Sequence, residues 1–258
     1  DIDEAGLGRR VEWCKNESSF ACADTGLGES PTAIRLARKT GAQTGVMDQY
    51  YILHPAKQTF AIAECAADTP RSSGAPVDKA KSFRDCTADY DGMEGAAFAE
   101  IPCFKSKAYY ANRYLHHPIY RYHICAIQDG TGDCVGVFVW RLCEAEGSRC
   151  IRITDYFGVP GALAGSRACF ETLLVEQDAE YIDFLCVGMD AAALEAAGFI
   201  ERHRAIGLIL PDYFEPFLRQ NVEVTYSYTG IPEAGVIFKG DSDKDRPNLL
   251  KRGEEHGA

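Results

Sequence analysis

Three side chains in the second half of the chain have the chemistry of a proton acceptor. Asp155 lies near the end of an alternating stretch, Asp183 lies inside an apolar run, and His203 follows a Gly-Phe pair. A carboxylate buried among apolar groups has a raised pKa, which suits a general base. The alternative for Asp155 is the capping of a turn, and the alternative for Asp183 is a structural ion pair. For His203 the sequence shows no visible partner.

The start of the chain suggests a second chemistry, the binding of an anion. Two glycines one residue apart precede two arginines in a segment that opens a helix: Gly6, Leu7, Gly8, Arg9 and Arg10. Free backbone N–H groups at the positive end of a helix favour a phosphate, and glycines let those amides converge. We therefore predict a pyrophosphate site at residues 6–10, rather than at 158–166, where Pro160 has no N–H to donate.

Other polar clusters have simpler explanations. Tyrosines and arginines between residues 109 and 122 suit either a sugar or nucleotide surface or the packing of a helix on a sheet. His116 and His117 point about 100° apart on a helix and share one ion poorly. The Asp-x-Asp-x-Asp run at 241–245 lacks the later glycine and glutamate of a calcium loop. The sequence therefore predicts no metal site.

Two predicted strands must position the candidate carboxylates. A period of two over 151–157 predicts a strand that the glycine-rich turn 158–165 ends. The apolar run 181–187 predicts a second, buried strand. Because a helical segment connects them, we expect the two strands to lie adjacent and parallel in a mixed sheet.

Helix and hairpin signals surround these strands. We expect Ser166 to cap the connecting helix, and Asp190 and Gly198 to bound a second short helix. Before them, 120–127 and 135–143 predict antiparallel strands around a turn. The fold class is therefore α/β, a mixed twisted sheet flanked by helices.

Composition divides the chain and limits its functions. Residues 66–97 are rich in small and polar residues, so we expect little regular structure there. The predicted organisation is a first module at 1–64, a linker at 65–100, a second module at 101–228 and a polar tail at 229–258.

The net charge of −11 argues against a nucleic-acid partner. Apolar runs are too short for a membrane span, and the eleven cysteines form no CxxC pair, so we expect reduced thiols and a cytoplasmic location.

The order of elements resembles the GNAT superfamily of N-acyltransferases. Two motifs add to the resemblance: the segment 3–10 resembles the pyrophosphate loop of that family, and 193–199 resembles its helix ending in Gly-Phe. In GNAT proteins the loop amides hold the pyrophosphate of coenzyme A, and the pantetheine arm lies between two strands that separate. The resemblance implies a GNAT-like sheet with a partial first module and a nearly complete second one.

The same resemblance implies an activity. It implies an N-acyltransferase that uses acetyl-CoA or another acyl-CoA and acts on a small-molecule amine or sugar. A looser likeness at 211–216 and 239–248 to GNAT-like proteins of bacterial surface-polysaccharide synthesis points to an amino sugar or a related precursor. The family's tyrosine is missing from both modules, and the first module lacks the strands before its loop. A catalytically silent GNAT-like binding or scaffold module is therefore the alternative, and a Fem-type aminoacyl transferase is a third that the acidic charge disfavours. The oligomeric state stays open.

Overall fold

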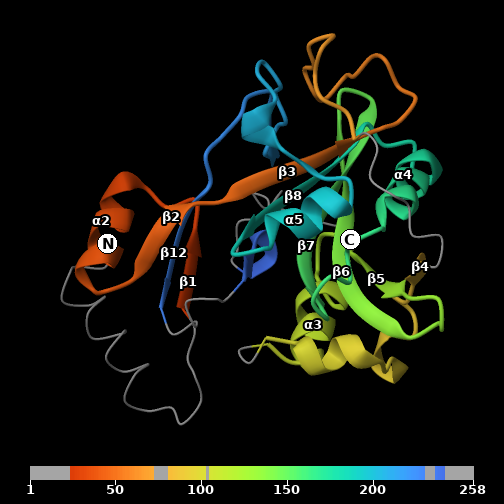
Figure 1. The fold of residues 1–258 in the computed structure, drawn as a ribbon. Helices are drawn as coiled ribbons and strands as arrows, with labels where there is room; N and C mark the ends of the chain where they lie inside the picture. Colours follow the sequence, from red (N-terminus) through yellow and green to blue (C-terminus); the bar gives the residue numbers. More distant parts are fainter. Residues whose placement is uncertain (1–23, 73–80, 103–104, 230–235, 242–258) are drawn as a thin grey trace, which may run out of the picture.

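The computed structural model describes residues 24–72, 81–102, 105–229 and 236–241. Its centre is a mixed sheet of eight strands in the order β4-β5-β6-β7-β8-β3-β9, with β13 paired to β8 (Figure 1). The strands are β3 Asp48–Leu53, β4 Ser82–Asp85, β5 His123–Gln128, β6 Cys134–Ala145, β7 Ser148–Gly158, β8 Tyr181–Val187, β9 Ile200–Glu201 and β13 Ile237–Phe238. The predicted α/β fold with a mixed sheet is confirmed.

Tight turns join the antiparallel strands β5, β6 and β7. The Asp129 carboxylate accepts hydrogen bonds from the N–H groups of Thr131 at 2.9 Å and Asp133 at 3.2 Å, which closes the turn between β5 and β6. Glu146 and Gly147 have positive φ and reverse the chain between β6 and β7. The predicted antiparallel pair around 129–133 is confirmed.

The strands β7 and β8 run parallel, as the sequence predicted, but only over a short distance. They pair at Ile151↔Ile182, Arg152↔Asp183 and Ile153↔Phe184. Beyond these pairs β7 continues along β6, whereas β8 continues along β3 and β13. The two strands therefore separate after Ile153 and Phe184, and Asp155 lies on β7 just past that point.

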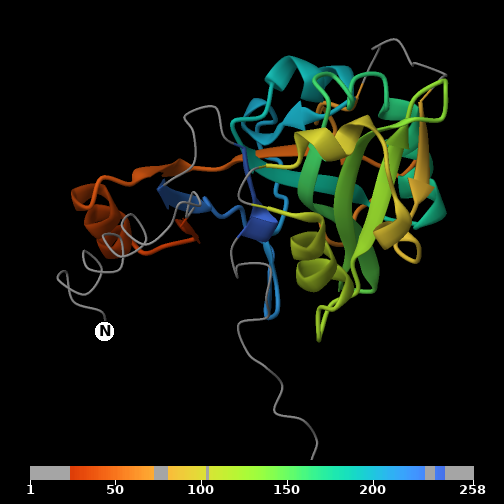
Figure 2. The same cartoon turned by 90° about the horizontal axis from the view of Figure 1, so that it is seen from below.

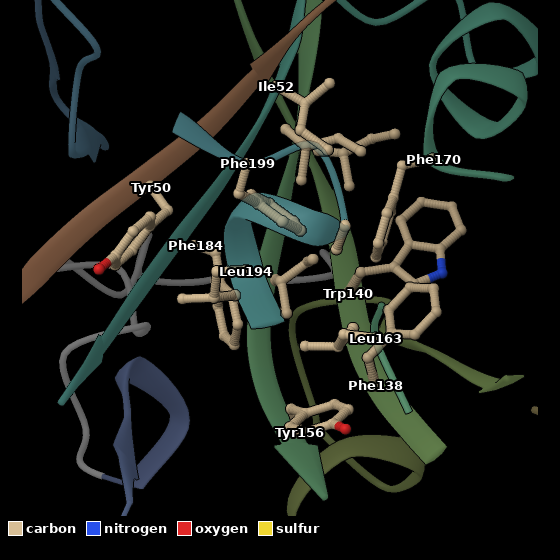
Figure 3. Packing of buried hydrophobic residues seen from close by; sticks show 14 of the residues in the cluster. Tyr50, Ile52, Phe138, Trp140, Tyr156, Leu163, Phe170, Phe184, Leu194 and Phe199 are labelled. Carbon is tan, nitrogen blue, oxygen red and sulfur yellow. The ribbon is translucent and has the colours of Figure 1, made fainter. Parts of the chain in front are cut away.

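Helices cover both faces of the sheet (Figure 2). They are α3 Lys107–Tyr110, the π-helical η3 Ala111–Leu115, α4 Arg167–Glu176 and α5 Ala191–Ala196. On one face, Phe170 of α4 and Leu194 of α5 pack with Phe199 and Trp140 in the main core (Figure 3). On the other face, Tyr110 and Tyr114 belong to a second buried cluster. Each cluster is apolar enough to hold its helices on the sheet.

The predicted helix ends are partly confirmed. The Asp190 side chain accepts a hydrogen bond from the N–H of Ala192 at 3.0 Å, and Gly198 has φ +89° after the end of α5. The cap predicted at Ser166 is wrong. Its backbone is not extended (φ −79°, ψ 2°), so its hydroxyl does not reach the N–H groups of α4.

A smaller sheet lies to one side of the main sheet (Figure 1). It has the order β1-β12-β2, with α2 packed against it. The elements are β1 Asp24–Leu27, α2 Pro31–Lys39, β2 Gln43–Val46 and β12 Thr225–Thr229. Only Met47 separates β2 from β3, so one extended run of chain joins both sheets.

Three strands of the main sheet come from outside the predicted second module. They are β3 from 1–64, β4 from 65–100 and β13 from 229–258. The expectation of little regular structure over 66–97 is wrong at β4, which pairs with β5. A mostly exposed edge strand needs few apolar residues, so composition did not reveal it. The division into modules stays a prediction.

Candidate active site where β7 and β8 separate

Asp155 is fully buried and surrounded by donors. Lys105 Nζ lies 2.8 Å from its Oδ1 and 2.9 Å from its Oδ2. The hydroxyl of Tyr114 donates to Oδ2 at 2.6 Å, and that of Tyr110 donates to Oδ1 at 3.2 Å. The N–H of Tyr156 donates to Oδ1 at 2.8 Å. Asp155 is therefore the centre of a buried network rather than the cap of a turn.

Lys105 joins this network to the end of the described chain. Its ammonium group also lies 2.6 Å from Oδ1 of Asp241, and it lies over the rings of Tyr109, Tyr110 and Phe238 at 5.2–5.8 Å. Burial opposes the charge of Lys105, but Asp155 and Asp241 raise its pKa above the ordinary value. Lys105 therefore stays charged.

Lys105 thus contacts two carboxylates, and the second of them, Asp241, is itself perturbed. Burial raises the pKa of Asp241 to about 6, with Lys105 lowering it and the charge of Asp155 raising it further. Burial, followed by the charge of Asp155, also raises the pKa values of Tyr110 and Tyr114 well above 10.0. Both tyrosine hydroxyls therefore remain protonated donors.

The segment 236–241 fills the space between the separated strands. Its β13 pairs with β8 at Ile237↔Val187 and Phe238↔Cys186, and the ring of Phe238 stacks on Phe184 with centroids 5.6 Å apart. On the other side, a Cβ on Gly240 would lie 2.8 Å from the carbonyl oxygen of Thr154 on β7. Contacts to both strands place this segment where they diverge.

Asp183, the second candidate, lies in a different buried network. Arg152 Nε and Nη2 donate to its two carboxylate oxygens at 3.2 and 3.0 Å. Arg152 also donates to the carbonyl oxygen of Asp212 at 3.0 Å, and Lys239 binds the Asp212 carboxylate. This is the ion pair that the sequence left open as an alternative to a site role.

His203, the third candidate, is exposed in η4 Arg202–Arg204. Its charge acts on Asp48, where burial and Glu201 raise the carboxyl pKa and His203 lowers it. Within the described ranges, no hydrogen bond joins Asp155, Asp183 and His203 to one another. The structure thus does not bring the three candidates into one site.

Five N–H groups of the loop 158–166 are already used within the protein. They donate to carbonyl oxygens of the protein: Val159 to Val135, Ala162 to Val159, Ala164 to Gly161, Gly165 to Ala196, and Ser166 to Leu163. Pro160 has no N–H. The predicted pyrophosphate-binding residues Gly6, Leu7, Gly8, Arg9 and Arg10 lie outside the described residues, so the preference for that loop stays a prediction.

The sequence did not single out Lys105, and it named Asp241 only as part of a polar run. A lone lysine after Phe104 has no pattern that marks it as buried. The tyrosine and arginine group at 109–122 was a usable signal, and Tyr109, Tyr110 and Tyr114 do form an aromatic group beside Lys105. Their rings pack inside the protein, as the packing alternative required.

In the described part of the chain, no cluster of three or more His, Cys, Asp or Glu side chains is arranged to hold a metal ion. Nor is any helix of the described ranges both long and apolar enough to cross a membrane.

No protein-family model matches the chain, and no curated protein matches it. Similar solved structures include a GCN5-related N-acetyltransferase from Anabaena variabilis, with 11% identity and a TM-score of 0.46 over 87% of this chain and 49% of that one. A probable N-acyltransferase from Enterococcus faecalis has 11% identity and a TM-score of 0.46 over 86% and 48%. N-myristoyltransferase of Saccharomyces cerevisiae with bound myristoyl-CoA has 8% identity and a TM-score of 0.42 over 78% and 58%.

The chain spans about half the length of the first two of these structures. Its strand order is antiparallel β5–β7, a parallel β7–β8 pair that separates, and β3 between β8 and β9, with α4 connecting β7 to β8. The mixed sheet that the sequence predicted is thus present, and β3, β4 and β13 from outside 101–228 complete it.

Proposed function

We propose that this chain is part of an acyl-CoA-dependent N-acyltransferase that acts where β7 and β8 separate. The observation that supports this proposal is the buried carboxylate of Asp155 with two tyrosine hydroxyls on it. Amide formation from a thioester requires an acceptor for the proton of the amine and a donor for the departing thiolate. Asp155 has the chemistry of the acceptor, and Tyr110 or Tyr114 has that of the donor.

The described arrangement is a closed one. With residues 236–241 between the strands, the pantetheine arm of an acyl-CoA does not fit beside Asp155. Asp155 is also fully occupied by its ion pair and hydrogen bonds. A reaction at this carboxylate therefore requires that segment to move and also requires Asp155 to exchange a donor for the amine.

The acceptor in this proposal is an amino sugar or a related precursor of a surface polysaccharide, and the donor is acetyl-CoA or another acyl-CoA in the cytoplasm. The likeness at 211–216 and 239–248 supports the acceptor class. The net charge of −11 supports a small amine over a polyphosphate acceptor, because like charges repel.

A catalytically silent binding or scaffold module is the second candidate. It is favoured by the same closed arrangement, because Asp155 and Asp183 are both buried in ion pairs. A module that never opens would keep the GNAT-like fold without its chemistry.

An acetylation assay separates the two candidates. The full chain is incubated with acetyl-CoA and a panel of amino sugars, and free coenzyme A thiol is followed with a thiol reagent. We expect turnover that Asp155→Asn reduces at least about 100-fold, since general acid–base groups contribute on the order of 10²–10⁴ in rate. The exposed Asp178→Asn is the control and keeps the rate of the unmodified protein. Equal rates in Asp155→Asn and the unmodified protein would remove Asp155 from the reaction, and no turnover with any amine supports the silent module.

A further inference from the structure

The segment 236–241 occupies its place through contacts that an extended ligand could also make. Its backbone pairs with the free edge of β8, and the ring of Phe238 lies against Phe184 in the main core. An extended arm that carries amide groups, as pantetheine does, can hydrogen-bond to a strand edge in the same manner. The segment and such an arm therefore need the same strand edge and the same space.

The ion pairs of the segment are arranged so that its departure leaves no buried charge without a partner. When Asp241 leaves Lys105, Lys105 keeps Asp155 at 2.8 Å. When Lys239 leaves Asp212, Asp212 keeps Arg152 at 3.5 Å. An unpaired buried charge is what makes the loss of an ion-pair partner costly. Lys105 and Asp212 thus each keep a charged partner when the segment leaves.

We propose that residues 236–241 are a removable internal plug that competes with acyl-CoA for the space between β7 and β8. The proposal rests on the proposed function, because it assigns the competing ligand as a coenzyme A thioester. As a consequence, the apparent association constant for acyl-CoA equals the intrinsic association constant multiplied by the fraction of molecules in which the plug is out.

Gly240 gives a way to remove the plug without substituting Asp155 or Lys105. A Cβ at this position would meet first the hydroxyl of Tyr114 and then the carbonyl oxygen of Thr154, at 2.8 Å. A larger side chain therefore cannot stay in place between the strands. Gly92 has open space around its Cβ position and no positive φ, so Gly92→Val is a matched control.

The experiment uses the full chain with Gly240→Val, Gly92→Val or no substitution. Hydrogen exchange followed by mass spectrometry reports whether residues 236–241 leave their place, and calorimetry with acetyl-CoA and with coenzyme A reports affinity. We expect faster exchange over 236–241 and at least about tenfold tighter binding in Gly240→Val, with Gly92→Val unchanged.

Each other outcome decides a different point. Faster exchange with unchanged acetyl-CoA affinity overturns the plug but leaves the proposed function standing. Faster exchange with no binding to any of the three proteins overturns the proposed function, and the plug with it. Unchanged exchange in Gly240→Val also overturns the plug, since the segment would then not depend on its close approach to β7.

Should Gly240→Val fail to fold, Arg113→Ala replaces it, because Arg113 Nε donates to the carbonyl oxygen of Gly240 at 3.1 Å. Arg113→Ala is expected to shift exchange and affinity in the same directions by smaller amounts, and no shift in either overturns the plug.

Discussion

Two buried groups of charges flank β7, and they differ in one respect. In the first, which we call the Arg152 cluster, Arg152 contacts Asp183 and Asp212, and Lys239 binds Asp212. In the second, the Lys105 cluster, one ammonium group contacts both Asp155 and Asp241. Both clusters join β7 to the plug.

The difference assigns the clusters different roles. In the Arg152 cluster, Arg152 binds both carboxylate oxygens of Asp183 and thereby joins β7 to β8. In the Lys105 cluster, burial raises the pKa of Asp241 to about 6, so this carboxyl changes its protonation near neutral pH. Titration and exchange of the plug are therefore expected to involve the Lys105 cluster, whereas stability is expected to depend most on the Arg152 cluster.

The largest expected effect comes from Arg152→Met. It removes the guanidinium that binds both oxygens of the buried Asp183 carboxylate and that also contacts Asp212. We expect a loss of about 3–5 kcal/mol in the free energy of unfolding, measured by urea denaturation. The exposed pair Arg84–Asp89 provides the control, since Arg84→Met is expected to cost about 0–1 kcal/mol. Equal costs at the two sites would remove the distinction between a buried structural cluster and a surface pair.

Lys105→Met is expected to cost less, about 2–3 kcal/mol at pH 5. Asp155 keeps the donors Tyr110, Tyr114 and Tyr156, and Asp241 is able to take up a proton. Because that proton is lost as pH rises, the cost should grow between pH 5 and pH 8. Urea denaturation at both values measures it, and a cost that is larger than that of Arg152→Met at pH 5 contradicts the comparison.

A pH profile of the unmodified protein tests the raised pKa of Asp241. The folded-state pKa of Asp241 is above its ordinary value of 3.8, so the folded state binds more protons between pH 4 and 6. Its contribution to stability is complete below about pH 4 and is lost as pH rises through about 6. One pKa unit corresponds to about 1.4 kcal/mol, so the loss is on the order of 3 kcal/mol. Asp241→Asn should remove this slope and the exposed Asp91→Asn should keep it; an unchanged slope in Asp241→Asn would show that Asp241 is not the titrating group.

The smallest effects are expected from the two tyrosines. Tyr114→Phe removes a donor at 2.6 Å and Tyr110→Phe removes one at 3.2 Å, while each ring keeps its packing. We expect losses of about 1–2 kcal/mol for Tyr114→Phe and about 0.5–1 kcal/mol for Tyr110→Phe, measured by thermal or urea unfolding. The reverse order would indicate that hydrogen-bond length does not govern the support of Asp155.

The sequence predicted those parts of the fold that depend on local signals. The strands at 151–157 and 181–187, and the cap at Asp190, follow from alternation, an apolar run and a side-chain oxygen before a helix. The partner of β3 was not predictable in this way, because its pairing with β8 spans more than a hundred residues of chain and leaves no local trace. The small-residue content of 66–97 hid β4, since an exposed edge strand shows little apolar pattern.

The site was predicted only in part, because local sequence signals mark some of its residues and not others. Asp155 was found because a carboxylate in an alternating strand is conspicuous. Its cation was missed because Lys105 comes from a distant segment, and charged residues are presumed exposed unless a partner is visible. Asp241 lies in a run whose composition predicts a solvated tail, yet its side chain is only 3% exposed. Burial of such groups depends on tertiary pairing, which one sequence does not display.

The most direct test of the account follows the plug in the unmodified protein. Hydrogen exchange over residues 236–241 is measured with and without saturating acetyl-CoA, with β5 and β6 as the internal reference. If acetyl-CoA enters between β7 and β8, exchange over 236–241 should become at least about tenfold faster while the reference strands stay unchanged. Bound acetyl-CoA that leaves exchange over 236–241 unchanged or slower would contradict the account.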